Sequence, residues 1–292
     1  MSAHHPLRAA LWMTGAIVSF TGMAIAGRAL AADLDTFEIM TYRSLIGIVL
    51  VLAAAAWAGT LGQITTRSLH IHFVRNISHF TGQNLWFYAV AAAPLAQVFA
   101  LEFTSPLWIT LFAPLFLGER LTRTRGLAAL LGFAGILIVA RPGVAGALSP
   151  GLVAAALAAI GFAGSATFTR LLTRTETTTC ILFHLTVMQA AFGLITAGID
   201  GAIAWPVPAA WPWLALVACA GLVAHFCLTT ALAIAPATVV MPIDFARLPI
   251  IALVGMALYG EPLDALVLAG AAVIFAANYL NIRAEARTHA SG

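Results

Sequence analysis

The chain has 292 residues, of which 62% are hydrophobic and 9% charged, with a net charge of +3 and a mean hydropathy of +0.98. Soluble domains are about 45–50% apolar and about 25% charged, so this composition excludes one water-soluble core and predicts an integral membrane protein. All fourteen basic residues are arginine. Without lysine there is no Walker A loop and no Schiff-base site, and the small net charge does not indicate nucleic-acid binding.

Ten apolar runs follow one another along the chain, each long enough for a helix that crosses about 30 Å of hydrocarbon. The connections between them are short. The sequence therefore predicts an all-α integral membrane protein with ten transmembrane helices and no separate soluble domain. The expected runs are 9–30, 38–58, 71–92, 94–117, 124–141, 151–171, 179–199, 211–234, 236–259 and 263–282.

The third run carries polar side chains at three- and four-residue steps, which places them on one helical face. Polar and ionisable groups are costly against lipid, so we expect this face to line a water-accessible substrate path. The alternative is that these groups only form hydrogen bonds that hold the helices together. The face consists of His72, Arg75, Asn76, His79, Gln83 and Trp86.

The fourth and ninth runs each carry an acid near the middle, Glu102 and Asp244, followed by a proline. A helical proline clashes with the carbonyl four residues before it. That carbonyl belongs to Glu102 itself for Pro106, and to Phe245, beside Asp244, for Pro249. Both helices are therefore expected to kink at their acids, and interrupted helices at matching positions of two repeats indicate a binding site.

The two acids also have a purely structural interpretation, as members of ion pairs that pack the helices. Asp244 has Arg247 one turn further on, whereas Glu102 has no cation within four residues and needs one from another helix, such as Arg43 or Arg75. Because Arg247 favours the ionised form of Asp244, we expect any proton coupling to run through Glu102.

The remaining aromatic, histidine and cysteine residues give weaker signals. Aromatic side chains near the acids suit either a cavity wall or a lipid-facing surface. His184 and His225 are single helix histidines, which are usually hydrogen-bonded core residues. The three cysteines show no metal-ligand spacing and are expected to be buried apolar side chains, so we expect neither metal nor cofactor. The cysteines are Cys180, Cys219 and Cys227.

An internal repeat organises the whole chain. One ungapped offset of 142 residues relates several motifs in the two halves, which predicts the duplication of a five-helix unit. The first repeat is expected to span residues 1–142 and the second 143–292. The matching pairs include Ala93-Pro94 with Ala235-Pro236, Glu102-Phe103 with Asp244-Phe245, Gly118-Glu119 with Gly260-Glu261, and Arg28 with Arg170.

Five is an odd number, so the second repeat must enter the membrane from the opposite side. Short cytoplasmic loops are rich in basic residues. With both termini in the cytoplasm, most loop arginines fall inside, Arg141 being the main exception, and the sequence predicts a 5+5 inverted-topology repeat. The inside arginines are Arg8, Arg67, Arg120, Arg123, Arg125, Arg174, Arg283 and Arg287.

Nearly the whole chain resembles the EamA family of the drug/metabolite transporter superfamily. The resemblance rests on Ala93-Pro94, Glu102, Gly118-Glu119-Arg120 and Arg141-Pro142-Gly143, and on Ala235-Pro236 and Gly260-Glu261-Pro262 in the second copy. It implies a ten-helix, multi-pass protein of the inner membrane, with six helices around a central cavity. The chain is most similar to YddG-type exporters of amino acids, including aromatic ones.

We therefore expect an exporter of amino acids and related metabolites that works by alternating access through a central cavity. The alternative is an importer of an S-adenosylmethionine-like or nucleotide-derived compound. A membrane enzyme is disfavoured because the sequence contains no nucleophile–base pair, and a scaffold because it needs no duplicated kinks. A homodimer is compatible with this architecture. The expected substrate-binding residues are His79, Gln83, Trp86, Tyr88, Glu102, Phe103, Trp108, His225, Asp244 and Arg247.

Overall fold

The computed structural model describes residues 6–116, 118, 123–141, 149–199, 201–234, 240 and 243–290. The described residues form helices and connections and contain no β-strand. The helices are α1 (Pro6–Leu30), α2 (Thr36–Trp57), α3 (Leu69–Ala92), α4 (Leu95–Glu102), α5 (Ser105–Phe116), α6 (Arg123–Ala140), α7 (Pro150–Leu172), α8 (Thr178–Ala197), α9 (Trp211–Ile234), α11 (Arg247–Tyr259) and α12 (Ala265–Ala290), with short 3-10 turns η1 (Leu61–Gln63) and η2 (Pro208–Ala210).

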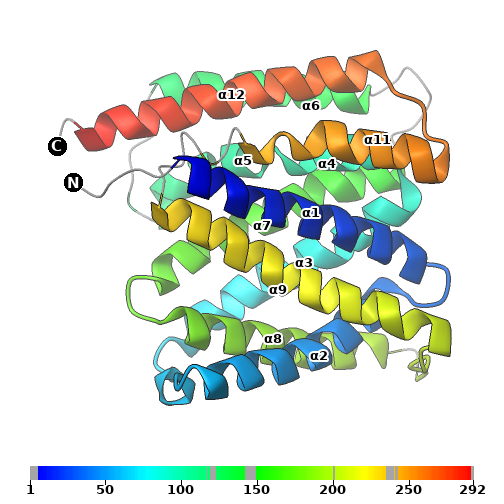
Figure 1. The fold of residues 1–292 in the computed structure, drawn as a ribbon. Coiled ribbons are helices and arrows are strands. Elements are labelled where there is room, and N and C mark those ends of the chain that lie inside the picture. The colour runs from blue at the N-terminus through cyan, green and yellow to red at the C-terminus, as the bar shows by residue number, and fades with distance from the viewer. Residues whose placement is uncertain are drawn as a thin grey trace.

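The helices lie side by side in layers (Figure 1). The pair α6 and α12 covers one side of the bundle and the pair α2 and α8 covers the other, with α1, α3, α7 and α9 between them. The start of α1 and the end of α12 lie at the same end of the bundle (Figure 1).

Seven stretches of the described chain are long and apolar enough to cross a membrane. They are α1, α2, the consecutive helices α4 and α5 together, α7, α8, η2 with most of α9, and α12. The helices α6 and α11 are apolar but shorter. Helix α3 has 24 residues, but its polar face makes it less apolar than α2 or α7. The chain is a multi-pass membrane protein.

The 142-residue offset found in the sequence also relates the helices. Adding 142 to both bounds of α3 gives the bounds of α9. The starts of α2 and α8, of α5 and α11, and of α6 and α12 are separated by the same offset. These helices of the described chain therefore recur in the same order in the two halves.

Equivalent helices of the two halves run in opposite directions where they pack. The hydroxyl of Thr179 at the start of α8 donates to Thr60 just after α2, at 3.1 Å. The backbone N–H of Ala204, beyond α8, donates to Glu38 at the start of α2, at 2.6 Å. Arg141 at the end of α6 pairs with Asp264 at the start of α12. The equivalent helices in each of these two pairs are thus antiparallel.

Close packing joins the halves, chiefly through the pairs α3 with α7 and α1 with α9. At the crossing of α3 and α7, a Cβ atom added to Gly161 would lie 2.7 Å from Cα of Gly82. Only glycine lets the two backbones approach this closely, as is common in membrane helix packing. This crossing places the polar face of α3 against the second half.

Candidate functional site

Both predicted helix interruptions are present, each directly after its acid. Helix α4 ends at Glu102, residues 103–104 form a turn, and α5 begins at Ser105. In the second half, Asp244 is helical, residues 245–246 form a turn, and α11 begins at Arg247. Asn278 of α12 donates a 2.7 Å hydrogen bond to the carbonyl of Phe103 and so satisfies an acceptor that the interruption frees.

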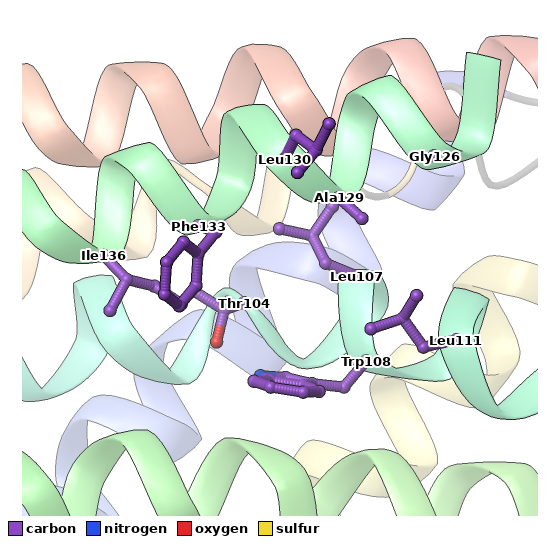
Figure 2. Close-up of a pocket in the computed structure, with 9 residues that line it drawn as sticks. All are labelled: Thr104, Leu107, Trp108, Leu111, Gly126, Ala129, Leu130, Phe133 and Ile136. Atoms are coloured by element: carbon purple, nitrogen blue, oxygen red, sulfur yellow. The ribbon is translucent and has the colours of Figure 1, made fainter. Parts of the chain in front are cut away.

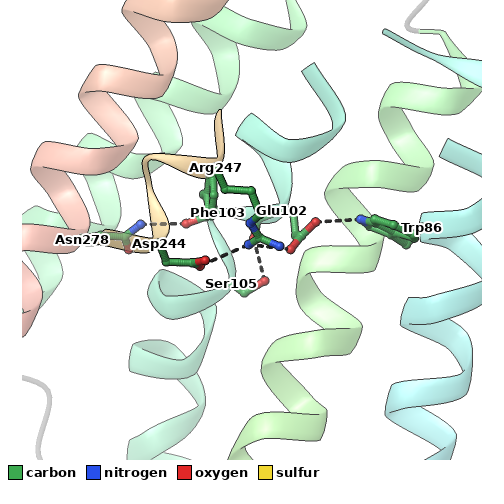
Figure 3. A network of polar contacts seen from close by, with 7 residues as sticks. All are labelled: Trp86, Glu102, Phe103, Ser105, Asp244, Arg247 and Asn278. Carbon is green, nitrogen blue, oxygen red and sulfur yellow. Dashed lines mark hydrogen bonds and ion pairs between the residues drawn. The ribbon is translucent and has the colours of Figure 1, made fainter. Parts of the chain in front are cut away.

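The acids of the two halves meet at one guanidinium (Figure 3). Arg247 Nη2 lies 3.2 Å from Glu102 Oε1 and 3.2 Å from Asp244 Oδ2. The indole N–H of Trp86 donates to Glu102 Oε2 at 2.7 Å. The side chain of Arg247 is only 4% exposed. Two carboxylates around one guanidinium carry a net charge of −1 when both are ionised, so the cluster can accept one further proton or cation.

Aromatic rings surround this guanidinium. Arg247 Cζ lies 4.6 Å from the ring centroid of Phe20, 5.1 Å from that of Phe99 and 4.9 Å from that of Phe103. Cation–π contacts of this kind stabilise a desolvated cation by up to about 2 kcal/mol. The rings come from α1, α4 and the turn after α4, so they hold Arg247 at the junction of the two halves.

Glu102 pairs with neither Arg43 nor Arg75, the cations expected for it from the sequence, so that expectation was wrong. In the described part of the chain, the cation paired with Glu102 is Arg247. Arg75 instead donates to Thr169 Oγ1 of α7 at 3.1 Å. Arg43 lies over the ring of Phe87, 5.8 Å from its centroid. The sequence did not indicate this partner of Glu102, because Arg247 lies in the other half of the chain, close to Asp244.

The polar face of α3 is buried, and its N-terminal part forms interhelical hydrogen bonds. Gln189 of α8 donates to both oxygens of Asn76, at 2.9 Å to the backbone and 3.2 Å to the side chain. Arg75 donates to Asn76 Oδ1 at 3.0 Å. These residues therefore hold neighbouring helices together, which was one of the two roles that the sequence allowed for the whole polar face.

Further along the same face the polar groups are less satisfied. The ring nitrogen Nδ1 of His79 lies 3.4 Å from Ser165 Oγ of α7, and its ring is 6.4 Å from that of His225 on α9. Gln83 Nε2 is buried and has no hydrogen-bond partner among the described residues. A buried unpaired amide is unfavourable unless a ligand or water completes it. His79, Gln83 and His225 therefore remain candidate substrate contacts.

The structure separates Tyr88 and Trp108 from that cluster. Tyr88 is 45% exposed, whereas Trp86 on the same helix is 2% exposed. Trp108 lies against a pocket of about 280 Å³ between α5 and α6 (Figure 2). Leu130 and Phe133 on the rim of this pocket are exposed, so it opens on the outer surface of the bundle. A substrate role for Tyr88 and Trp108 stays a prediction, without a contact to the cluster among the residues that the structure describes.

Two statements about the cysteines need correction. Cys219 is exposed, unlike the buried Cys180 and Cys227. A metal-ligand spacing is also present, because Cys180 and His184 are one helical turn apart on α8, and His72 of α3 lies beside them. The four-residue spacing was visible in the sequence, but its third member was not.

The chain is similar to known membrane transporters over most of its length. A model of the EamA-like transporter family matches residues 7–141 and again 149–283. A riboflavin transporter of Brucella anthropi is 31% identical over 254 residues, covering 86% of this chain and 89% of the relative. An S-adenosylmethionine uptake transporter of Rickettsia bellii is 25% identical over 276 residues, covering 94% and 93%. A crystal structure at 20% identity matches with a TM-score of 0.64 over 93% of this chain and 95% of that one, which shows the same fold.

Proposed function

Because the chain belongs to the EamA-like transporter family, we propose that this inner-membrane transporter moves a planar aromatic metabolite of the riboflavin class by alternating access. The observation that carries the proposal is the caged guanidinium of Arg247, shared by Glu102 and Asp244 at the interruptions of both halves. Interrupted helices at the interface of inverted repeats are where carriers of this architecture bind substrate.

The chemistry of the cluster suits a flat, hydrogen-bonding ring system. Phe103 and Phe245 stack at 4.5 Å between centroids, and Trp86 lies next to Phe99 at 5.9 Å. Aromatic faces can exchange such contacts for contacts with a heterocycle. The acids Glu102 and Asp244 accept hydrogen bonds from ring N–H groups or hydroxyls. The riboflavin transporter relative, at 31% identity, supports the same substrate class.

We propose further that ten helices cross the membrane as two inverted five-helix repeats, residues 1–142 and 143–292, which rock against each other about the cluster. Opposite directions of equivalent helices support this arrangement, as the pairing of Arg141 with Asp264 illustrates. Both termini then lie in the cytoplasm. Single cysteines introduced at Ser2 and Ser291 should be labelled by a membrane-impermeant reagent only after the membrane is opened, and labelling of intact cells would contradict this topology.

Export of amino acids is the second candidate function. It is favoured by one observation, that carboxylates and a guanidinium lie together at 3.2 Å. Such a set can bind the ammonium and the carboxylate of a zwitterion with complementary charges. One relative, at 25% identity, is an S-adenosylmethionine uptake transporter. Import of a cationic amino-acid derivative, which the same charged groups could bind, is therefore the alternative.

One experiment separates these candidates. Purified protein is reconstituted in liposomes, and uptake and efflux of labelled riboflavin, phenylalanine and S-adenosylmethionine are measured against empty liposomes. Saturable riboflavin flux that unlabelled riboflavin competes, and that Arg247→Gln abolishes, is the expected result. Saturable flux of phenylalanine or S-adenosylmethionine without riboflavin flux would replace the proposed substrate with the second candidate. Flux of none of the three would contradict both substrate classes.

A further inference from the structure

Three side chains with metal-binding atoms gather away from the charge cluster, near the starts of α3 and α8. They are His72 on α3 and Cys180 and His184 on α8. One ligand atom from each lies within 4.8 Å of the others, and all three side chains are buried. Cys180 Sγ is 3.8 Å from His184 Nδ1, and the two imidazole rings stack with centroids 4.3 Å apart.

Neither nitrogen of His72 has a hydrogen-bond partner among the described residues, although the side chain is 0% exposed. A neutral imidazole carries one donor and one acceptor, and buried groups of this kind are normally satisfied. Packing between helices can account for the burial of His72. It does not account for the two ring nitrogens that have no partner in the described structure. A bound ion would use the free lone pair.

A backbone carbonyl sets the tautomer of His184. Its Nδ1 lies 3.1 Å from the backbone carbonyl of Cys180, and a carbonyl can only accept, so Nδ1 carries the proton. The lone pair is then on Nε2. A ring N–H donated to a backbone carbonyl is the usual way in which proteins fix the tautomer of a metal-bound histidine.

Negative charge is available next to the three residues. Glu176 lies four residues before Cys180, in the bend that precedes α8, and its Oε2 accepts a 2.8 Å hydrogen bond from the hydroxyl of Thr65. Its Oε1 is buried without a partner among the residues described. The backbone N–H of Thr65 also points at Cys180 Sγ, at 3.4 Å, and would stabilise a thiolate there.

We propose that His72, Cys180 and His184 form a binding site for a transition-metal ion of the Zn²⁺ type. One thiolate and two imidazoles match the borderline-soft ligand preference of Zn²⁺, and the fourth tetrahedral position is open to Glu176 or water. On binding, the thiol of Cys180 loses its proton to solvent and a Zn–S bond forms, so one proton is released per ion. The imidazole rings must turn out of their stack. The ion would join α3 of the first half to α8 of the second.

The test uses full-length, tag-free protein in detergent, stripped with a chelator and then dialysed against Zn²⁺. We expect about one Zn²⁺ retained per chain, and Co²⁺ in its place should give a thiolate-to-metal charge-transfer band. Cys180→Ser should abolish that band, and His72→Gln should weaken binding by more than the roughly 10–100-fold loss typical of outer-shell changes. Cys219→Ser, which changes an exposed cysteine, is the matched control and should bind like the wild type.

Gel filtration of each variant checks that it stays folded. If Cys180→Ser does not stay folded, His72→Gln still tests the site. Wild-type protein that retains no Zn²⁺ would overturn the proposal. So would folded Cys180→Ser and His72→Gln proteins that bind Zn²⁺ as tightly as the wild type, since the ion would then lie elsewhere. Because the readout is binding, failure of this site is distinct from failure of the transport proposal.

Discussion

Phe103 and Phe245 occupy the same position in the two repeats, 142 residues apart, and their rings stack with centroids 4.5 Å apart and planes 24° apart. Each is the first residue of the turn that interrupts its helix. Residues related by an internal two-fold symmetry touch each other only close to the symmetry axis. The stack therefore marks the axis that relates these two turns, and the acids that precede the two rings flank it.

The cation at this axis breaks the symmetry. Subtracting the repeat offset from Arg247 gives Ser105, whose hydroxyl donates to the carbonyl of Glu102 at 2.7 Å. A single guanidinium therefore serves both Glu102 and Asp244. Duplication alone would have given two cations or none, and the predictions for the cluster follow from this imbalance.

The first prediction concerns the stability of the cluster. Glu102→Gln and Asp244→Asn should each leave the protein folded, because Arg247 keeps the other carboxylate. The double variant leaves a buried guanidinium without a counter-ion, which costs about 3–5 kcal/mol and should lower the melting temperature by roughly 10 °C. Thermal unfolding in one detergent compares the four proteins. If the melting temperature of the double variant falls only by the sum of two small single-variant effects, the two ion pairs contribute independently and the prediction is wrong.

The second prediction concerns proton coupling. Two acids share the one cation of Arg247, so the cluster can hold one proton, and the side chain of Glu102 is the more exposed of the two, at 16% against 8% for Asp244. Glu102→Gln mimics the protonated acid. It should spare substrate exchange in liposomes but remove the response of net flux to a pH gradient. Asp244→Asn is the matched comparison and should retain that response. Wild-type flux that ignores the gradient would show that the protein is a facilitator.

The third prediction separates binding from packing on α3. Gln83→Leu removes a buried amide whose Nε2 lacks a partner within the described residues. It should leave the melting temperature unchanged or raised, yet abolish transport. Asn76→Leu is the control on the same face and should destabilise the fold by about 1–3 kcal/mol, because Arg75 and Gln189 lose the side-chain oxygen that accepts from them at 3.0 and 3.2 Å. Normal transport by a stable Gln83→Leu protein would assign this position to packing.

His79 of the first half is a second test of this face, because its ring contacts the second half at Ser165 and His225. His79→Leu should abolish transport and leave the protein monodisperse in gel filtration. Transport at the wild-type rate would reduce the role of His79 to an interhelical contact.

The fourth prediction concerns pH and the loop before α12. The hydrogen bond from Arg141 holds the pKa of Asp264 below its usual value of 3.8. A carboxyl with a lowered folded-state pKa contributes stability above its unfolded pKa, and this is lost as pH falls through the folded pKa. Asp264→Asn keeps the helix cap on Leu266. It should lower the melting temperature by roughly 1–3 °C at neutral pH, with the difference vanishing at strongly acidic pH. A difference that persists in acid would exclude the charge as its cause.

The sequence by itself determined the features that depend on neighbouring residues. Hydropathy identified the apolar helices, because a segment in lipid must carry apolar side chains and must form its backbone hydrogen bonds within itself, as a helix does. Proline chemistry located the interruptions after Glu102 and Asp244, since a proline acts on the carbonyl four residues before it. The repeat offset predicted which helices correspond, and α3 and α9 have equivalent bounds.

Tertiary structure alone decided which side chains meet. Glu102 pairs with Arg247 because the two interruptions lie together at the axis, although the residues belong to different halves. His72 reaches Cys180 and His184 because α3 packs against α8. Trp108 lies on an outward pocket because α5 presents that side to α6. The strength of a polar contact falls steeply with distance and angle, so side-chain partners depend on how helices from the two halves cross, which no local pattern records.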